Sequence, residues 1–335
     1  MQFKSTFTFL SIVGLVSALA VERRQASPDA QSPEQFEAFA QFSFASYCRE
    51  LHDGKVDTAV CTTDKQGTPC AGFGDVKTTA EFTGDGKNGI GGYVAVDKAQ
   101  GRIVVALKGT DNIKEIGTDI AIAQVDSDLC DGCKVHEGFN EGFKSVKAQL
   151  ETALRAETDK PGQQAYRVVV AGHSLGASVA MLAGASLRKQ GVALDMYLYG
   201  CPFVGNAKFA EFVASQPGLT ARITNKDDLV PAVPKRGIPP QQTYEHVFPE
   251  FWYERGLALP GLYRAAGPRV CRSAAECTSA DCSKPQNGLL LSGCNLTDHG
   301  LYAGGAGFRP CAGEPDALGT ALASLKGGRR RGAGG

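Results

Sequence analysis

The chain has 335 residues, of which 43% are hydrophobic and 21% charged, which provides enough apolar material for a large core and excludes global disorder. Lys and Arg number 35, Asp and Glu number 35, and the formal net charge is zero, which argues against binding to nucleic acid. The eleven cysteines are too many for a typical cytosolic enzyme, and their odd number leaves at least one unpaired within a monomer.

The N-terminus has the pattern of a secretory signal peptide. Residues 1–20 contain Lys4, then a short apolar run that ends in the small-x-small sequence Ala-Leu-Ala at 18–20. The run is too short for a transmembrane helix, which needs about 20 apolar residues, and we expect no integral membrane segment elsewhere. A dibasic pair closes a predicted propeptide at 21–24. Secretion makes the cysteines candidates for disulfides.

Helix and strand patterns alternate along the rest of the chain. A first helix begins with Ser32 as its N-cap and Pro33 in its first turn. Further elements are predicted in this order: strands at 91–97 and 102–108 joined by a turn at 98–101, a helix at 137–155, a strand at 166–171, a helix at 174–190, a strand at 194–199, a helix at 206–215 and a strand at 219–224.

This alternation predicts an α/β fold with a mostly parallel central sheet flanked by helices in a single domain. The valine-rich run at 166–171 is typical of a strand buried on both faces. We place the domain at residues 25–312. Residues 313–335 are small, polar and rich in Gly and Arg, and are predicted to form a flexible tail.

The turn between the strand at 166–171 and the next helix carries the strongest chemical signal. It fits the pattern Gly-x-Ser-x-Gly, which presents a nucleophilic serine at the end of a strand. So tight a turn strains the backbone of Ser174, while Gly172 and Gly176 lack the Cβ atoms that would collide between strand and helix. Ser174 is the predicted nucleophile, and His173 is expected to point away from its hydroxyl.

A serine hydroxyl needs a base to remove its proton and an acid to orient that base. In this type of fold the chain order is Ser, acid, His. Of five histidines, only His246 and His299 follow the acid position. We favour His299, in a loop-like segment, because residues 244–248 alternate like a strand and suit a structural histidine. Asp227 and Asp228 both follow a strand end and both qualify as the acid.

Together these motifs resemble the secreted fungal lipases and feruloyl esterases often called class 3 lipases, over residues 39–311. The resemblance implies the α/β-hydrolase fold. It selects Asp228 through the Asp-Leu-Val-Pro sequence at 228–231, and His299 through an Asp-His pair followed by an aromatic at 298–302. Residues 244–252 are similar to a non-catalytic landmark of the family. Residues 199–206 resemble another landmark, with Cys and Phe at two unexpected positions.

The oxyanion of an ester-hydrolysis intermediate needs preorganised N–H donors. One is expected from Leu175, directly after the nucleophile, and the resemblance implies Thr110 as the second. The family carries its lid in the segment that follows Thr110. Ile113, Ile116 and Ile120 form one apolar helical face there, which would make activity depend on a lipid interface. An ordinary core-packing turn is the alternative.

Secretion and the resemblance together sort the cysteines. Two expected pairs match bridges of the family and a third would tie the ends of the domain together: Cys61 with Cys70, Cys130 with Cys133, and Cys48 with Cys311. A group of four before the histidine loop allows three connectivities: Cys271, Cys277, Cys282 and Cys294. Cys201 is left over as a buried thiol.

We therefore predict a secreted, extracellular serine hydrolase of carboxylic esters, with triacylglycerol or another ester lipid at an oil–water interface as its substrate. No cofactor, metal or nucleic-acid partner is predicted. A feruloyl esterase of plant cell-wall esters is the alternative enzyme, and a catalytically silent binding protein on the hydrolase fold is the alternative of another class. Residues 295–297 form a glycosylation sequon.

Overall fold

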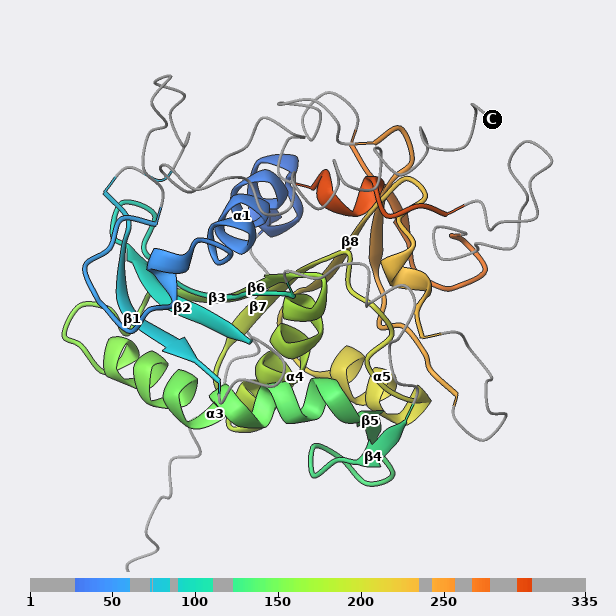
Figure 1. Cartoon of the computed structure of the whole chain (residues 1–335), viewed down its shortest axis with the longest axis horizontal. Helices are drawn as coiled ribbons and strands as arrows, with labels where there is room; N and C mark the ends of the chain where they lie inside the picture. Colours follow the sequence, from blue (N-terminus) through green and yellow to red (C-terminus); the bar gives the residue numbers. More distant parts are fainter. Residues whose placement is uncertain are drawn as a thin grey trace, which may run out of the picture.

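Eight strands form the central sheet of a computed structural model that describes residues 28–60, 73, 75–84, 90–110, 123–234, 243–256, 267–277 and 294–302 (Figure 1). Their order is β1 (Lys77–Thr83), β2 (Gly91–Asp97), β3 (Arg102–Leu107), β6 (Arg167–His173), β7 (Leu194–Tyr199), β8 (Thr220–Asn225), β9 (Glu250–Tyr253) and β10 (Arg269–Cys271). Strands β3, β6, β7, β8 and β9 run parallel, whereas β1, β2 and β10 join antiparallel. The predicted leader and tail lie outside the described residues.

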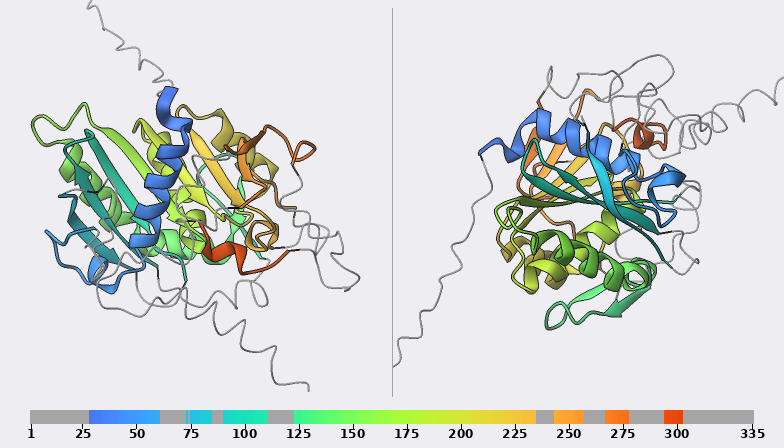
Figure 2. Two further views of the ribbon diagram at one scale, coloured as in Figure 1. Left: turned by 90° about the horizontal axis from the view of Figure 1, so that it is seen from above. Right: turned by 90° about the vertical axis from the view of Figure 1, so that its left-hand side faces the viewer.

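Helices cover both faces of this sheet (Figures 1 and 2). One face packs against α1 (Pro33–Ala45), and the other against α3 (Glu137–Thr158), α4 (Leu175–Lys189) and α5 (Ala207–Ser215). A small second sheet pairs β4 (Gln124–Asp126) with β5 (Lys134–His136). Four short 3-10 helices complete the described elements: η1 (Pro28–Gln31), η2 (Arg49–Leu51), η3 (Val230–Ala232) and η4 (Asp298–Gly300).

Strands β6, β7 and β8 are buried almost throughout, as the hydrophobic pattern predicts for strands covered on both faces. Alternate residues serve opposite layers: Val168 and Val170 belong to the core beneath α3 and α4, whereas Val169 and Ala171 belong to the core beneath α1. The fold therefore holds the carboxyl ends of these central strands between two packed layers.

Local signals fixed the helix starts. Ser32 Oγ accepts a hydrogen bond from Gln35 N at 3.3 Å, with Pro33 in the first turn, so the predicted N-cap is confirmed. Asn206 caps α5 in the same way, because its Oδ1 accepts from Phe209 N at 3.0 Å. Helix α3 begins where predicted, but it continues to Thr158 beyond the predicted end at residue 155.

The strand-like alternation predicted at 244–248 was wrong. Glu245 makes only an isolated bridge with Gly205, and the next strand, β9, starts at Glu250. Before β9, a backbone carbonyl bonds to a side chain and not to a neighbouring strand: the Val247 carbonyl accepts from Arg222 Nε at 2.9 Å. A period-two pattern cannot distinguish this arrangement from a strand ladder.

Six of the seven described cysteines are disulfide-bonded, and the seventh is a buried thiol. Cys130 is bonded to Cys133 and Cys271 to Cys277, with Cα–Cα distances of 5.2 Å and 5.7 Å. Cys48 and Cys294 each take part in a further disulfide. The predictions for Cys61, Cys70 and Cys311 lie outside the described residues, as does Cys282.

Cys201 is the one unpaired cysteine of the described part of the chain, as expected. Burial raises the pKa of its thiol to about 12, so the nucleophilic thiolate form is strongly disfavoured near neutral pH.

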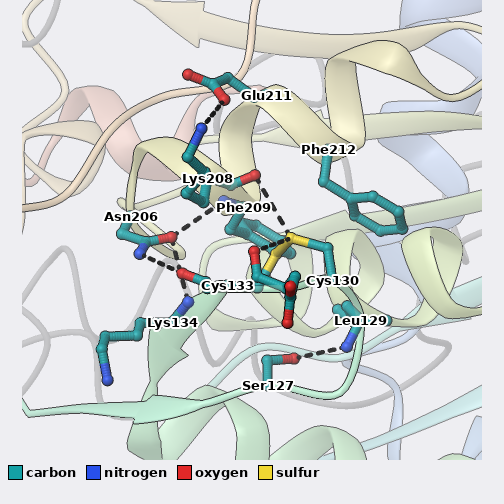
Figure 3. Close-up of a disulfide and its surroundings, with 12 residues drawn as sticks. Ser127, Leu129, Cys130, Cys133, Lys134, Asn206, Lys208, Phe209, Glu211 and Phe212 are labelled. Carbon is teal, nitrogen blue, oxygen red and sulfur yellow. Dashed lines mark hydrogen bonds and ion pairs between the residues drawn. A yellow bond between two sulfur atoms is a disulfide. The ribbon is translucent and has the colours of Figure 1, made fainter.

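The Cys130–Cys133 disulfide closes the turn of the β4–β5 hairpin and lies against the start of α5 (Figure 3). Asn206 joins the two, since its Nδ2 donates to the Gly132 carbonyl at 2.9 Å and its Oδ1 accepts from Lys134 N at 3.2 Å. The side chain that caps α5 thus also fixes the disulfide turn. Among the described residues, no helix has the length and apolar character needed to cross a membrane.

A buried ion pair joins β8 to β9. Arg222 Nη2 lies 2.8 Å from Glu250 Oε2, with both side chains at most 4% exposed. Thr224 donates to the other oxygen of Glu250 at 2.5 Å. Removing one partner of such a pair leaves an uncompensated buried charge, which costs more than the pair itself contributes.

Replacing Glu250 with Ala is expected to lower the free energy of unfolding by about 3–5 kcal/mol, because it strands the Arg222 guanidinium. Urea denaturation measures the effect. The matched control is Glu254→Ala, which breaks an ion pair with Arg269 whose side chains are 46% and 54% exposed and should cost less than about 1 kcal/mol. Equal costs for the two variants would contradict a special role for the buried pair.

Candidate active site

Ser174 stands at the turn between β6 and α4 in a backbone conformation that L-residues rarely adopt. Its φ is 61° and its ψ is −130°. The flanking glycines make this turn possible: a Cβ on Gly172 would lie 2.6 Å from the Gly176 carbonyl carbon, and a Cβ on Gly176 would lie 2.7 Å from that of Lys108. Packing between strand and helix therefore holds the serine at the carboxyl end of β6.

Asp228 and His299 meet at the same end of the sheet. His299 Nδ1 lies 2.8 Å from Asp228 Oδ2, and the two side chains are 0% and 1% exposed. Tyr302 donates its hydroxyl to the same oxygen at 2.7 Å, and Val230 N donates to Asp228 Oδ1 at 2.9 Å. Of the two aspartates left open by residue patterns alone, Asp228 is the one that is hydrogen-bonded to the histidine.

Two buried polar atoms at this site make no hydrogen bond within the described part of the chain: Ser174 Oγ and His299 Nε2. An unsatisfied buried polar group costs about 1–3 kcal/mol, so such groups are rare and call for a functional explanation. Because Asp228 occupies Nδ1 of His299, Nε2 is the nitrogen that remains for proton transfer.

Gly200, at the end of β7, is a site residue that the sequence patterns did not identify. Its φ is +55°, and a Cβ there would lie 2.8 Å from His299 Cε1 and 2.9 Å from both His299 Nδ1 and Asp228 Oδ2. Only a glycine fits this space without moving the Asp–His pair. The available signal was its place directly after a buried strand.

His173 connects the serine turn to the histidine loop. Its Nε2 lies 2.9 Å from the His299 carbonyl oxygen and its Nδ1 lies 3.0 Å from the Tyr47 hydroxyl. Burial, with the nearby His299 as a second cause, holds the pKa of His173 well below 6.5. The neutral ring has one N–H, and a carbonyl can only accept, so Nε2 donates to His299 and Nδ1 accepts from Tyr47.

Tyr47 also reaches the loop that precedes Thr110, where a Cβ on Gly109 would collide with the Tyr47 hydroxyl and lie 3.3 Å from Ser174 Cβ. This loop, at the end of β3, thus passes against the serine turn. Leu175 is the first residue of α4, so its N–H is one of those without an acceptor inside the helix. The sequence patterns did not identify Tyr47 as a site residue either.

The remaining predicted residues either do not contact the Asp–His pair or lie outside the described residues. His246 Nε2 lies 2.8 Å from the Pro231 carbonyl, and its ring stacks on Phe203 with centroids 3.8 Å apart. His246 thus supports the loop after Asp228. The predicted lid residues Ile113, Ile116 and Ile120 lie outside the described residues. No group of three metal-ligating side chains occurs in the described ranges.

Comparisons with known proteins identify relatives of this chain. The family model described as Lipase (class 3) matches residues 104–237. A secreted mono- and diacylglycerol lipase from Fusarium solani is 36% identical over 282 residues, covering 79% of each chain. The crystal structure of a mono- and diacylglycerol lipase from Aspergillus oryzae is 33% identical with a TM-score of 0.59, covering 65% of this chain and 78% of that one.

A lipase from Rhizopus microsporus var. chinensis is 27% identical with a TM-score of 0.66, covering 84% of this chain and 89% of that one. The fold is thus that of an α/β-hydrolase. The enzyme is a carboxylic-ester hydrolase. The chain belongs to the class 3 lipase family, and the protein is secreted, as the N-terminal pattern and the cysteine content predict.

Replacing Gly200 with Ala is expected to lower kcat/KM for a soluble ester by about 100-fold, the cost of a displacement near 1 Å at reacting groups. The new Cβ would push His299 away from Asp228. Initial-rate kinetics measures the change.

The matched control for this change is Gly191→Ala. Gly191 also has a positive φ, of +91°, but nothing lies within 4 Å of its added Cβ. It should lose stability by about 1–2 kcal/mol from backbone strain and keep its activity. Full activity in the Gly200 variant would show that the pair tolerates the added methyl group.

The depressed pKa of His173 predicts a loss of stability in acid. Below pH 6.5, the ordinary pKa of histidine, the unfolded chain takes up a proton that folded His173 does not. Stability from this group is therefore present above that pH and falls below it, by at most about 1.4 kcal/mol per pH unit. Denaturation from pH 7 to pH 5 should show a smaller slope for His173→Gln than for the wild type.

Tyr47→Phe provides the control for this pH effect, because it removes the hydroxyl from Nδ1 but leaves the titrating ring. It should lower stability by about 1 kcal/mol and keep the wild-type slope. The same slope in the wild type and His173→Gln would assign the acid sensitivity to other groups.

Proposed function

We propose that Ser174, His299 and Asp228 form the catalytic triad of a lipase that works through an acyl-enzyme. Ser174 Oγ attacks the ester carbonyl carbon while His299 Nε2 takes its proton, and His299 then protonates the leaving alcohol. Water next attacks the acyl-enzyme with His299 again as base, which releases the fatty acid and restores the serine. Asp228 fixes the imidazole tautomer and stabilises the imidazolium.

The buried hydrogen bond between Asp228 and His299 carries this proposal, because it directs Nε2 of His299, and not Nδ1, to the reaction. The two unpartnered atoms, Ser174 Oγ and His299 Nε2, are the pair between which the proton would pass. Both sit at the carboxyl ends of parallel strands, where open α/β sheets bind their ligands.

Thr110 and Leu175 would supply the oxyanion hole. Leu175 N is at the positive end of the α4 dipole, and Thr110 follows the loop that packs on the serine turn. Each donor of this kind is worth about 3–4 kcal/mol of transition-state stabilisation. Both would be preorganised by the contacts of Gly109 and Gly176 with the backbone beside them.

The surroundings of the site suit an apolar substrate. Val230 and Val233 form a small apolar cluster, and Leu175 and Leu296 pack against it. Once the site is open, an acyl chain could lie against Leu175 and Leu296, the partly buried members of this group, and Leu175 directly follows Ser174. A hydroxycinnamate ester has no long aliphatic chain to pack against these side chains.

Access to the site supports an interfacial mode of action. The Ser174 and His299 side chains are 0% exposed, so part of the chain must move before a lipid ester can reach them. The sequence pattern of Ile113, Ile116 and Ile120 suits a segment that turns its apolar face to an oil–water interface. The apolar contact would offset the cost of opening.

Acylglycerols are the substrate class we propose. The relatives from Fusarium solani and Penicillium cyclopium, 36% and 32% identical, are named mono- and diacylglycerol lipases. The relatives from Rhizopus, at 29% identity, are named simply lipases. These names favour partial glycerides as good substrates within the class.

The secreted enzyme should release fatty acid from emulsified long-chain diacylglycerol at least as fast as from triacylglycerol, and should have little activity on methyl ferulate. Titration of released acid measures all three. Ser174→Ala should lower the rate by roughly 10⁴-fold or more without preventing folding. Hydrolysis of the ferulate alone would overturn the substrate proposal, and an active Ser174→Ala enzyme would overturn the triad.

The interfacial part of the proposal can fail separately. A short-chain ester, followed across its solubility limit, should show a jump in rate where droplets form. Smooth saturation across that limit would remove the interface from the mechanism while leaving the triad in place.

A further inference from the structure

One motif in the chain lies beside the catalytic residues but takes no part in the proposed chemistry. Asn295-Leu296-Thr297 is the only Asn-x-Ser/Thr sequence in the chain, and its middle residue is not Pro. Such a sequence is an acceptor of N-linked oligosaccharide in proteins that pass through a secretory pathway. The secreted character of this family member makes that chemistry available.

The backbone of Asn295 is fixed against the loop that carries Asp228. Asn295 N donates to the Asp227 carbonyl at 2.8 Å, and Leu229 N donates to the Asn295 carbonyl at 3.1 Å. The two segments thus form a parallel bridge between Asp228 and Asn295. Despite this bracing, Asn295 is exposed, so an attached group would project into solvent.

Within the described residues, the Asn295 side chain bonds only to Asp298. Its Oδ1 accepts from Asp298 N at 2.9 Å, and its Nδ2 donates to Asp298 Oδ2 at 2.8 Å. An amide NH₂ has two hydrogens, and glycosylation replaces only one of them. A glycosylated Asn295 retains its carbonyl oxygen and one N–H, the two groups that hold Asp298.

We propose that Asn295 carries an N-linked oligosaccharide at the rim of the active site. The side-chain nitrogen forms a bond to the anomeric carbon of a lipid-pyrophosphate-linked oligosaccharide. The bond from that carbon to the pyrophosphate oxygen breaks, the amide loses one proton, and the lipid pyrophosphate leaves. No oxidation or reduction is involved.

This modification places a bulky hydrophilic group between the two loops that hold the Asp–His pair. Asn295 is bonded to both neighbours of Asp228 on one side and to Asp298, the residue before His299, on the other. The glycan would cover the exposed side of that junction and shield it from proteases. Asn295 itself is exposed, whereas the next residue, Leu296, packs inward against the buried cluster of Val230 and Val233.

The test is to secrete the full chain from a eukaryotic host that attaches N-glycans and to measure its mass before and after peptide N-glycosidase. The wild type should lose mass on digestion, and Asn295 should be recovered as Asp in the released peptide. Because the chain has one sequon, any N-glycan reports on this residue. An unmodified Asn295 peptide as the main species would overturn the proposal.

Three variants separate the glycan from the hydrogen bonds of Asn295. Thr297→Ser keeps the sequon and should keep the glycan. Thr297→Ala should lose it while leaving the Asn295–Asp298 bonds intact, since the Thr297 side chain makes no hydrogen bond within the described residues. Asn295→Gln loses both. A digestion-sensitive glycan on Thr297→Ala would also overturn the assignment.

Activity then shows which role matters. Thr297→Ala should hydrolyse a short soluble ester within about twofold of the wild type, as expected for a surface change, and should be digested faster by a protease. Asn295→Gln should show the same protease sensitivity and a further fall in kcat. Equal protease resistance of glycosylated and unglycosylated protein would overturn the shielding role.

Discussion

The burial of one carboxyl group organises the described site. Asp228 is 1% exposed, and a buried acid is tolerable only if its oxygens are hydrogen-bonded. Its partners come from three places in the chain: the backbone of Val230 in the following turn, the ring of His299 and the hydroxyl of Tyr302. Satisfying Asp228 therefore requires the C-terminal histidine segment to fold back onto the end of β8. The same bonds that stabilise the fold thereby set the imidazole in the orientation that the proposed triad requires.

The order of the sheet explains why residues far apart in sequence meet here. Strands β3, β6, β7 and β8 are parallel neighbours, so their carboxyl ends lie in a row. Thr110, Ser174, Gly200 and Asp228 each follow one of these four ends. The row leaves little free space, which is why glycines occur where a side chain would press on Ser174, His299 or Asp228. His173 adds a link across the row, because its two ring nitrogens join Tyr47, two residues after the end of α1, to the histidine segment.

Much of this arrangement was predictable, for a physical reason. The central strands and helices have long, strongly periodic patterns, and the serine turn has a steric requirement that glycine spacing reveals. By contrast, β1 and β10 form the two edges of the central sheet, β9 lies next to β10, and β4 and β5 form the small second sheet. All of these strands except β1 are short, so their patterns are weak. Gly200 and Tyr47 escaped prediction because their roles depend on a contact with a distant segment, which no local pattern records. The Cys271–Cys277 pairing is likewise a three-dimensional fact that spacing left open.

Full burial of Ser174 and His299 has two opposing consequences. Exclusion of water strengthens the electrostatic interactions on which oxyanion stabilisation depends. It also leaves two polar atoms without a partner among the described residues, at a cost in stability. For a small dissolved substrate, a closed form that carries this cost in stability would bring an enzyme little advantage. For a substrate held in a lipid phase the balance differs, because apolar contact at the interface can drive the opening that water alone does not favour. The buried, unsatisfied pair is thus consistent with an enzyme whose closed form persists in water and whose chemistry takes place against lipid.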